Sequence, residues 1–214
     1  MRIPGLGIHI TREEPRHEHI MWHTGWYVRH IRPVIEERGG VLMLVDKTLW
    51  EMPEDKREGN ILHDTGEIAI LSAFFATALA NYGAPPANLY LGLDHRAALA
   101  EADTLATMAA HELALATSGY ERKAVISGGV GTALEDFYIN QPAAYYRADS
   151  KTVEWTCATN PWAAAVDNLF LCTDTTAVVD AASKHMIASK ALSASRTLLV
   201  GDKLQASLYV GLSE

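Results

Sequence analysis

Cysteine is scarce in this chain of 214 residues, which contains Cys157 and Cys172 and no others. Neither belongs to a Cys-x-x-Cys pair or to a Cys/His spacing that would hold zinc. No secretion signal accompanies them, so we expect two buried free thiols; a disulfide between them is the alternative.

Long hydrophobic runs are also missing. No apolar run approaches the roughly 20 residues that a membrane helix needs. Residues 1–5 do not open an apolar signal-peptide core. We therefore expect a protein that is made in a reducing cytoplasm and is used there or assembled into a particle there.

Positive charge is in deficit, with 18 Lys and Arg against 26 Asp and Glu, a formal net charge of -8 and a pI near 5.6. General nucleic-acid binding needs a basic footprint, so this balance argues against it. An acidic surface favours contact with basic patches on a protein partner. Hydrophobic residues make up 49% of the chain, which is enough for one buried core.

Residues 1–32 differ from the rest of the chain. They hold five Arg against three acidic residues, and five of the nine His, so their formal charge is +2 and the remaining residues carry -10. Gly and Pro interrupt the segment at Pro4, Gly5, Gly7 and Pro15. This composition predicts an extended N-terminal arm, followed by a β-rich core domain over residues 33–214. Fully extended, such an arm reaches about 100 Å and could order on an acidic neighbouring subunit.

Two strand-like runs, residues 26–31 and 41–45, flank a Glu-Glu-Arg-Gly-Gly turn at residues 36–40, and together they predict a β-hairpin. A helix is predicted over about residues 64–81. Asp64 and Glu67 fit a capping box, and apolar residues follow at helical spacing. The Ala-rich residues 97–116 favour helix by propensity, or a loop around Asp103.

Short β-like runs with frequent turn signals fill much of the remaining chain. They are residues 88–93, 121–127, 152–156, 169–172 and 204–210. The pattern predicts a mainly β fold with one or two helices (α+β), built on a β-sandwich core with the arm and the hairpin attached.

The triplet Asp64-Thr65-Gly66 matches the Asp-Thr-Gly of aspartic proteases. Such a site needs an apolar strand before the triplet and a loop after it. Here His63 stands where an apolar residue is wanted, and a helical pattern follows. Capping of that helix explains the same residues, and both interpretations stay open.

His17, His19 and His23 have spacings that could bind zinc or another transition metal. No further ligand is evident, so we predict no metal and no cofactor, and contact with a neighbouring subunit is the simpler interpretation. The glycine-rich residues 128–132 lack the Lys-Ser/Thr of a phosphate loop, and no G-x-S-x-G elbow is present. Trp155, Trp162 and Phe170 would suit a sugar-stacking shelf or, more simply, a core.

Five segments in order resemble small virion proteins of tailed bacteriophages, described as head decoration, neck or tail fibre-like proteins. Residues 60–67 resemble the segment that opens their helix, and residues 88–93, with Leu-Gly-Leu, resemble their first core strand. Residues 118–125 resemble a Gly-Tyr turn into a strand, and residues 162–173 a strand entered from a Trp. Residues 192–202 resemble an Arg-Thr…Gly-Asp ending.

The sequence departs from this group at Glu121, where a small residue is usual, and in the Ala-rich stretch 97–116, which looks like an insertion. The resemblance implies a non-enzymatic structural component of the virion, either a capsid cement protein or a head-to-tail or tail component. It implies other virion proteins as partners and a homo-oligomer, with no direct contact to nucleic acid or membrane. The candidate assembly contacts are Arg12, Arg16, Trp22, Trp26 and Arg29. A receptor- or glycan-binding fibre module is the alternative, and an aspartic-type protease is a further one.

Overall fold

The computed structural model describes residues 21–59, 61–64, 66, 89–113, 119–126, 137–140, 146–158, 162, 164–174 and 185–213. Within them the chain is mainly β, as predicted, with two antiparallel sheets. Residues 1–20 and most of the helix predicted over residues 64–81 lie outside the described residues. Within that predicted helix, Asp64 and Gly66 are described and are helical.

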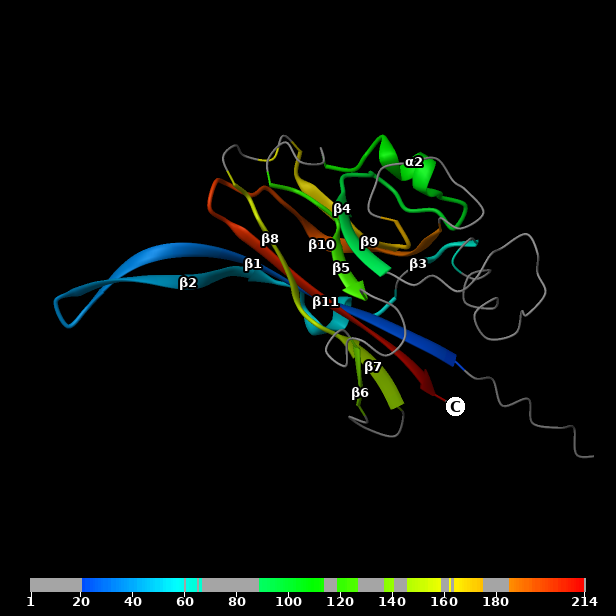
Figure 1. Ribbon diagram of the computed structural model, residues 1–214, viewed down its shortest axis with the longest axis horizontal. Helices are drawn as coiled ribbons and strands as arrows, with labels where there is room; N and C mark the ends of the chain where they lie inside the picture. The colour runs from blue at the N-terminus through cyan, green and yellow to red at the C-terminus, as the bar shows by residue number, and fades with distance from the viewer. Residues whose placement is uncertain are drawn as a thin grey trace, which may run out of the picture.

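The first sheet has six strands in the order β2-β1-β11-β7-β6, and β8 also pairs with β11. Its strands are β1 (Met21–Arg38), β2 (Val41–Glu51), β6 (Phe137–Asn140), β7 (Tyr146–Ser150), β8 (Val153–Thr156) and β11 (Lys203–Ser213). The last strand, β11, pairs with the first, β1, along eleven residue pairs, so the two ends of the described chain lie side by side (Figure 1).

The second sheet has five strands in the order β3-β10-β9-β4-β5. Its strands are β3 (Ile61–Leu62), β4 (Leu89–Asp94), β5 (Lys123–Ile126), β9 (Val166–Cys172) and β10 (Met186–Arg196). A short helix, α2 (Leu105–Ala109), begins at Thr104, whose side chain accepts a hydrogen bond from the N–H of Thr107. A 3-10 turn spans Glu54–Lys56.

The main core lies between the two sheets. Trp26, Val28 and Trp155 from the first sheet pack with Leu91 and Leu169 from the second. The opposite face of the second sheet is also covered, because Phe170 and Met186 pack against Leu105 and Met108 of the α2 segment. This packing gives the β-sandwich its buried layers, since strands expose alternate side chains to opposite faces.

The N-terminal segment differs from the expected arm over its described part. Residues 21–31 pair with β11, and Trp26 and Val28 are buried in the main core. These two side chains share the inward face of β1, so the segment contributes to the core and is a strand of the sandwich. Cys157 and Cys172 are buried free thiols, as predicted.

The hairpin predicted from the sequence is confirmed. β1 and β2 pair in antiparallel register from Arg29↔Glu51 to Arg38↔Val41. Gly39 and Gly40 form the two-residue turn with φ values of 61° and 82°. Positive φ at both positions is the geometry of a type I′ turn, which glycine adopts without steric cost and which suits the twist of the flanking strands.

Candidate assembly surface

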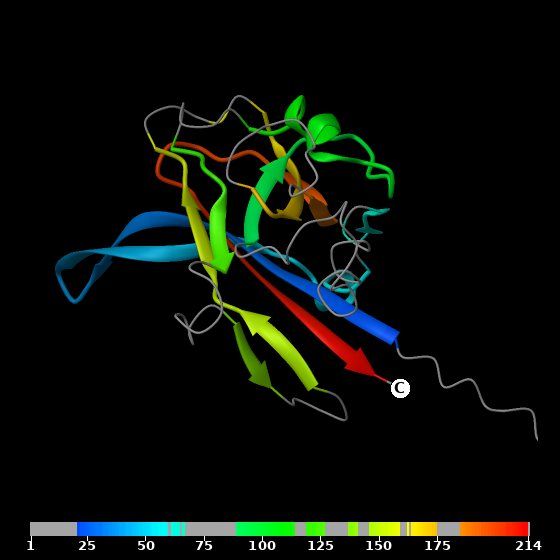
Figure 2. The ribbon, with the colours of Figure 1, turned by 45° about the vertical axis from the view of Figure 1, so that its right-hand side comes forward.

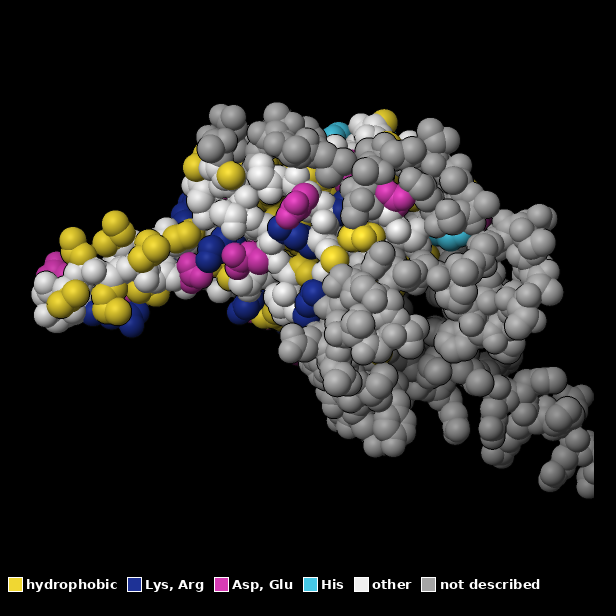
Figure 3. Space-filling view, in the orientation of Figure 1, with side chains coloured by type: hydrophobic (Ala, Val, Ile, Leu, Met, Phe, Trp, Pro, Cys, Tyr) yellow, Lys and Arg dark blue, Asp and Glu magenta, His cyan; other side chains and the backbone are white. Residues whose placement is uncertain are grey.

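The tip of the β1–β2 hairpin projects beyond the sandwich. In Figures 1 and 2, two views 45° apart, it extends away from the rest of the chain. Its side chains are exposed although many are apolar, and Figure 3 shows hydrophobic side chains gathered along it. The large exposed hydrophobic residues of the hairpin are Ile35, Val41, Leu42, Met43, Leu44 and Leu49.

The exposed residues occupy both faces of the hairpin. Ile35 is paired with Leu44, so these two and Leu42 share one face, which continues the outer face of the first sheet. They are exposed by 70%, 73% and 71%. Val41 and Met43 lie on the opposite face, which continues the inward face of the sheet. A strand that is apolar on both faces is typical of a buried strand, yet the described part of this chain leaves β2 open to solvent.

A buried carboxylate fixes the base of the hairpin. Asp202, in the turn between β10 and β11, accepts hydrogen bonds from Arg32 Nε at 2.6 Å, from Arg32 Nη2 at 2.7 Å and from His30 Nε2 at 3.0 Å. The N–H of Leu199 also donates to it at 3.0 Å. His30 and Arg32 flank the position where the β1–β2 register shifts, between His30 and Ile31.

Electrostatics favour the ionised form of this carboxylate. Burial alone would raise the pKa of Asp202, but the hydrogen bonds from Arg32, Leu199 and His30 outweigh burial and lower the pKa to about 2. Close by, Lys203 Nζ lies 3.2 Å from Asp46 and 3.6 Å from Glu154. The β-bulge and these contacts hold β1 and β2 to the body at the point where the hairpin leaves it.

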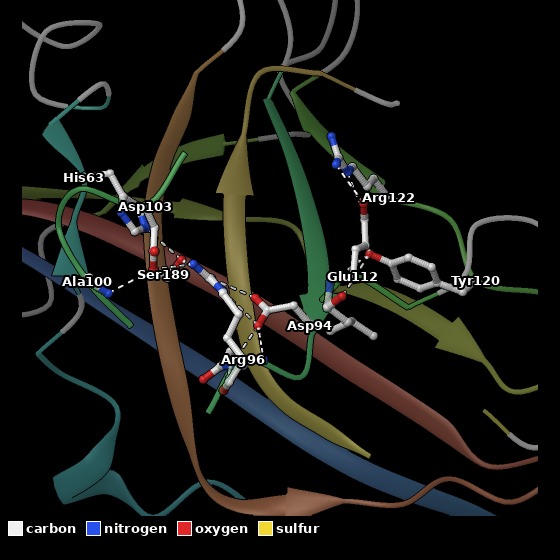
Figure 4. Close-up of polar contacts among 11 residues, drawn as sticks. His63, Asp94, Arg96, Ala100, Asp103, Glu112, Tyr120, Arg122 and Ser189 are labelled. Atoms are coloured by element: carbon white, nitrogen blue, oxygen red, sulfur yellow. Dashed lines mark hydrogen bonds and ion pairs between the residues drawn. The ribbon is translucent and has the colours of Figure 1, made fainter. Parts of the chain in front are cut away.

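Two buried polar groups lie against the second sheet, and Figure 4 shows them side by side. In the first, Arg96 donates to Asp94, to Asp103 and to Ser189 Oγ, and Asn168 donates to Asp94. In the second, a single carboxylate accepts hydrogen bonds from a guanidinium and a phenol. Both groups are candidates for chemistry because they combine charge with burial.

The second group is centred on Glu112. Arg122 binds its carboxylate through Nε at 2.7 Å and Nη2 at 2.8 Å, and Tyr120 donates its hydroxyl at 2.8 Å. The guanidinium of Arg122 also lies over the ring of Phe170, 5.3 Å from its centre. Burial and the Glu112 carboxylate raise the pKa of Tyr120 well above its usual value, so the phenol keeps its proton.

A histidine and a serine meet in the first group. His63 Nε2 lies 2.9 Å from Ser189 Oγ, and His63 Nδ1 lies 3.2 Å from the carbonyl of Glu101. Burial and the neighbouring Arg96 lower the pKa of His63, so its imidazole is neutral, with Nδ1–H donating to the carbonyl and Nε2 accepting from the hydroxyl. A Ser–His contact is the first requirement of a nucleophilic site.

Both groups are shielded from solvent. Ser189 and His63 are fully buried, and Arg96 and Arg122 are nearly so. Their charges and donors are used within the fold, as expected for polar groups that must be satisfied when buried. We interpret both groups as structural links between β4, β9, β10 and the segment that covers them.

The structure places the predicted site residues as follows. Arg12, Arg16, His17 and His19 lie outside the described residues; for Trp22 and His23 the backbone is described, and it pairs with β11. Trp26 is 2% exposed in the core, so its side chain is not offered to a partner. Arg29 lies on the outer face, where Nη2 donates to Gln205 at 2.5 Å.

The alternatives raised from the sequence receive no support from these positions. Trp155, Trp162 and Phe170 are buried, which corrects the idea of a sugar-stacking shelf made from them. Asp64 is exposed, and its N–H donates to Glu101. Within the part of the chain that the structure describes, no hydrogen bond joins Asp64 to a second carboxylate.

Two further features are absent from the described residues. These residues contain no group of three or more His, Cys, Asp or Glu side chains that could hold a metal ion. Among the same residues, no helix is both long enough and apolar enough to cross a membrane.

Comparison with known proteins finds no match. No family model matches the chain, and neither a curated protein nor a solved structure matches it.

Proposed function

We propose that this chain is a non-enzymatic structural protein that acts through contacts with other protein subunits, in the particle of a tailed bacteriophage. The single observation that carries the contact role is the exposed β1–β2 hairpin, with apolar side chains on both faces. The assignment to a phage particle is supported by the five segments that resemble, in the same order, virion proteins of tailed bacteriophages.

The energetics of the hairpin support a contact role. Ile35, Leu42 and Leu44 are each about 70% exposed and lie together on one face. Burying apolar surface contributes about 25 cal/mol per Å², so covering these side chains would stabilise a complex. β2 is also an edge strand, whose free N–H and C=O groups can pair with another chain.

The rest of the described structure is consistent with a contact role. The polar groups that resemble a catalytic constellation are buried and mutually satisfied, and the net charge of -8 disfavours nucleic acid as the partner. Asp202, bound by His30 and Arg32, fixes the base of the projecting hairpin to the body, which suits a structural contact.

The test uses particles produced by the genome that encodes this chain. A Leu42→Lys/Leu44→Lys variant places charge on the hairpin, and Val200→Lys, at an exposed apolar side chain off the hairpin, is the control. We expect the wild type and the control to be recovered with purified particles, and the hairpin variant to be lost from them. Particles without the wild-type chain, or a turnover activity abolished by one point substitution, would contradict the proposal.

A further inference from the structure

The apolar part of β2 is self-complementary. Val41, Leu42, Met43, Leu44 and Val45 read the same in both directions, with Met43 at the centre. Four of these five side chains are exposed, including Met43 at 48%. A palindromic strand can pair with an identical antiparallel strand so that every apolar side chain meets an apolar side chain.

The backbone of β2 is also open along one edge. β2 is the end strand of its sheet, with β1 on one side and no described strand on the other. In a hairpin with a two-residue turn, the closing pair Arg38↔Val41 exchanges hydrogen bonds, and the direction alternates along the strand. Leu42 and Leu44 therefore point their N–H and C=O groups toward the open edge.

We infer that β2 pairs with β2 of a second copy of this chain, in antiparallel register about a two-fold axis through Met43. Val41 then lies opposite Val45 of the second copy, Leu42 opposite Leu44, and Met43 opposite Met43. Such an isologous contact closes on itself, which is the commonest form of homo-oligomer. Leu42 and Leu44 form the hydrogen-bonded pairs, and Met43 forms a close pair without them.

Charge disfavours registers centred farther along β2. With the axis at Met43, Asp46 and Lys47 lie opposite Gly40 and Gly39 of the second copy, so no like charges meet. An axis at Asp46 or at Lys47 would place that charge directly opposite its own copy, which destabilises a sheet. The register that aligns the apolar side chains is therefore also free of charge repulsion.

The projection of the hairpin leaves room for this contact. Met43 is near the tip, and Glu51, at the end of β2, is eight residues away, or about 27 Å along the strand. The two bodies then lie at opposite ends of a four-stranded ribbon made from two hairpins. Figure 1 shows the tip well clear of the sandwich.

Disulfide trapping tests the register. In Met43→Cys the two introduced thiols meet at a close pair with Cα atoms about 4.5 Å apart, within the range of a disulfide. In the control Thr48→Cys the corresponding atoms are ten residues apart along the ribbon, or about 33 Å. Cys157 and Cys172 are fully buried and supply the wild-type background. We expect a reducible dimer from Met43→Cys in mild oxidant, and none from Thr48→Cys or the wild type.

A charge exchange provides a second test by light scattering. Leu42→Glu and Leu44→Lys each place a charge opposite an apolar side chain, so each single variant is expected to be monomeric at 23.4 kDa. In the double variant the introduced carboxylate of one copy faces the introduced ammonium group of the other, and the dimer is expected to return. Equal cross-linking of Met43→Cys and Thr48→Cys, or a wild type that stays monomeric at every concentration, would overturn the inference.

This inference rests on the proposed function, because both use the hairpin as the contact. Experiments can disprove either proposal without disproving the other. If the chain enters particles through its hairpin but Met43→Cys gives no dimer, the self-pairing is wrong and the structural role stands. If the dimer forms but particles lack the chain, the phage role is wrong and the self-pairing stands.

Discussion

Arg32 and Asp202 form a two-bonded ion pair, with Arg32 Nε and Nη2 at 2.6 and 2.7 Å from the two carboxylate oxygens. The pair joins β1 to the β10–β11 turn at the base of the projecting hairpin. Asp202 is almost fully buried, while Arg32 is 37% exposed. This pair should stabilise the fold more than an ordinary surface salt bridge does, because it is bidentate and its acceptor is shielded from water.

Asp202→Asn should therefore destabilise the fold. The pKa of about 2 in the folded chain, against 3.8 for an ordinary Asp, corresponds to about 2 kcal/mol of stability at neutral pH. Urea unfolding at pH 7 measures the loss. Lys203→Ala, which removes contacts to Asp46 and Glu154 on the same sheet, is the control and should cost less than about 1 kcal/mol. Equal losses in the two variants would contradict this account.

The same carboxylate gives the wild type an acid-sensitive component of stability. Because the folded pKa lies below the unfolded value, the contribution is complete above pH 4 and is lost as the pH falls from 4 to about 2. The difference in unfolding free energy between the wild type and Asp202→Asn should shrink over that range. A constant difference between pH 7 and pH 2 would show that the effect of the substitution is not electrostatic.

His63 should make the fold less stable in mild acid. Its pKa is lowered in the folded chain, by burial first and then by Arg96, so the unfolded chain binds the proton more readily. Stability is complete above pH 6.5 and falls as the pH drops below it. The groups facing His63 are Arg96, Asp103, Ser189 and the carbonyl of Glu101. In His63→Gln, whose side chain does not titrate, the unfolding free energy should depend less steeply on pH between 7 and 5. An unchanged slope would show that other groups cause the pH dependence.

Arg96→Met should be strongly destabilising. The substitution keeps apolar volume but leaves Asp94 and Asp103 without their cation, and removal of one partner from a buried pair costs about 3–5 kcal/mol. Lys56→Met is the matched control, because Lys56 pairs with Asp55 in an exposed ion pair. Chemical denaturation should separate the two variants clearly. A small effect of Arg96→Met would mean that the buried carboxylates become protonated or hydrated at little cost.

Gly92→Ala should disturb the second sheet. A Cβ at this position would overlap the ring of Phe170, the residue directly across the strand pair. Phe170 is fully buried, so the strain is expected to cost about 1–3 kcal/mol. Phe170→Leu in the same chain removes the ring, so the two substitutions should be less than additive in thermal unfolding. Additive losses would place the strain elsewhere.

Local signals in the sequence were sufficient to predict the hairpin and several strands. Gly39 and Gly40 between two apolar runs predict a tight turn. The alternation in residues 204–210 predicts β11, and the apolar run before Gly92 predicts β4. These elements carry the periodicity of a strand within their own residues, so no tertiary information was needed.

β10 shows where local signals fail. Residues 186–196 include three Ala and three Ser and few β-branched or aromatic residues, yet they form an eleven-residue strand between β3 and β9. Pairing with two neighbours overrides propensity there. The buried polar groups could not be predicted from local sequence either. His63 and Ser189 are 126 positions apart in the sequence and meet only because the sheet brings their strands together.

Only the strand of the contact surface, and not its exposure, could be predicted from the sequence. The run from Val41 to Val45 was recognised as a strand, but a strand that is apolar on both faces predicts burial within the chain. That the described chain leaves it exposed follows from the length of β1 and β2 beyond the second sheet, which local sequence does not encode. The role of Asp202 in fixing the hairpin likewise depends on residues about 170 positions away in the sequence.

The most direct test of the central claim is amide hydrogen exchange over residues 33–47, measured in the free monomer at high dilution and again in the assembled particle. In the monomer, the N–H groups of Leu42 and Leu44 face the open edge of β2 and should exchange rapidly. Assembly should slow the exchange of the Leu42 and Leu44 N–H groups, while those of Val41, Met43 and Val45, which face β1 in both states, and the β4 and β9 amides change little. Equal exchange of the hairpin in both states would contradict a contact role for it.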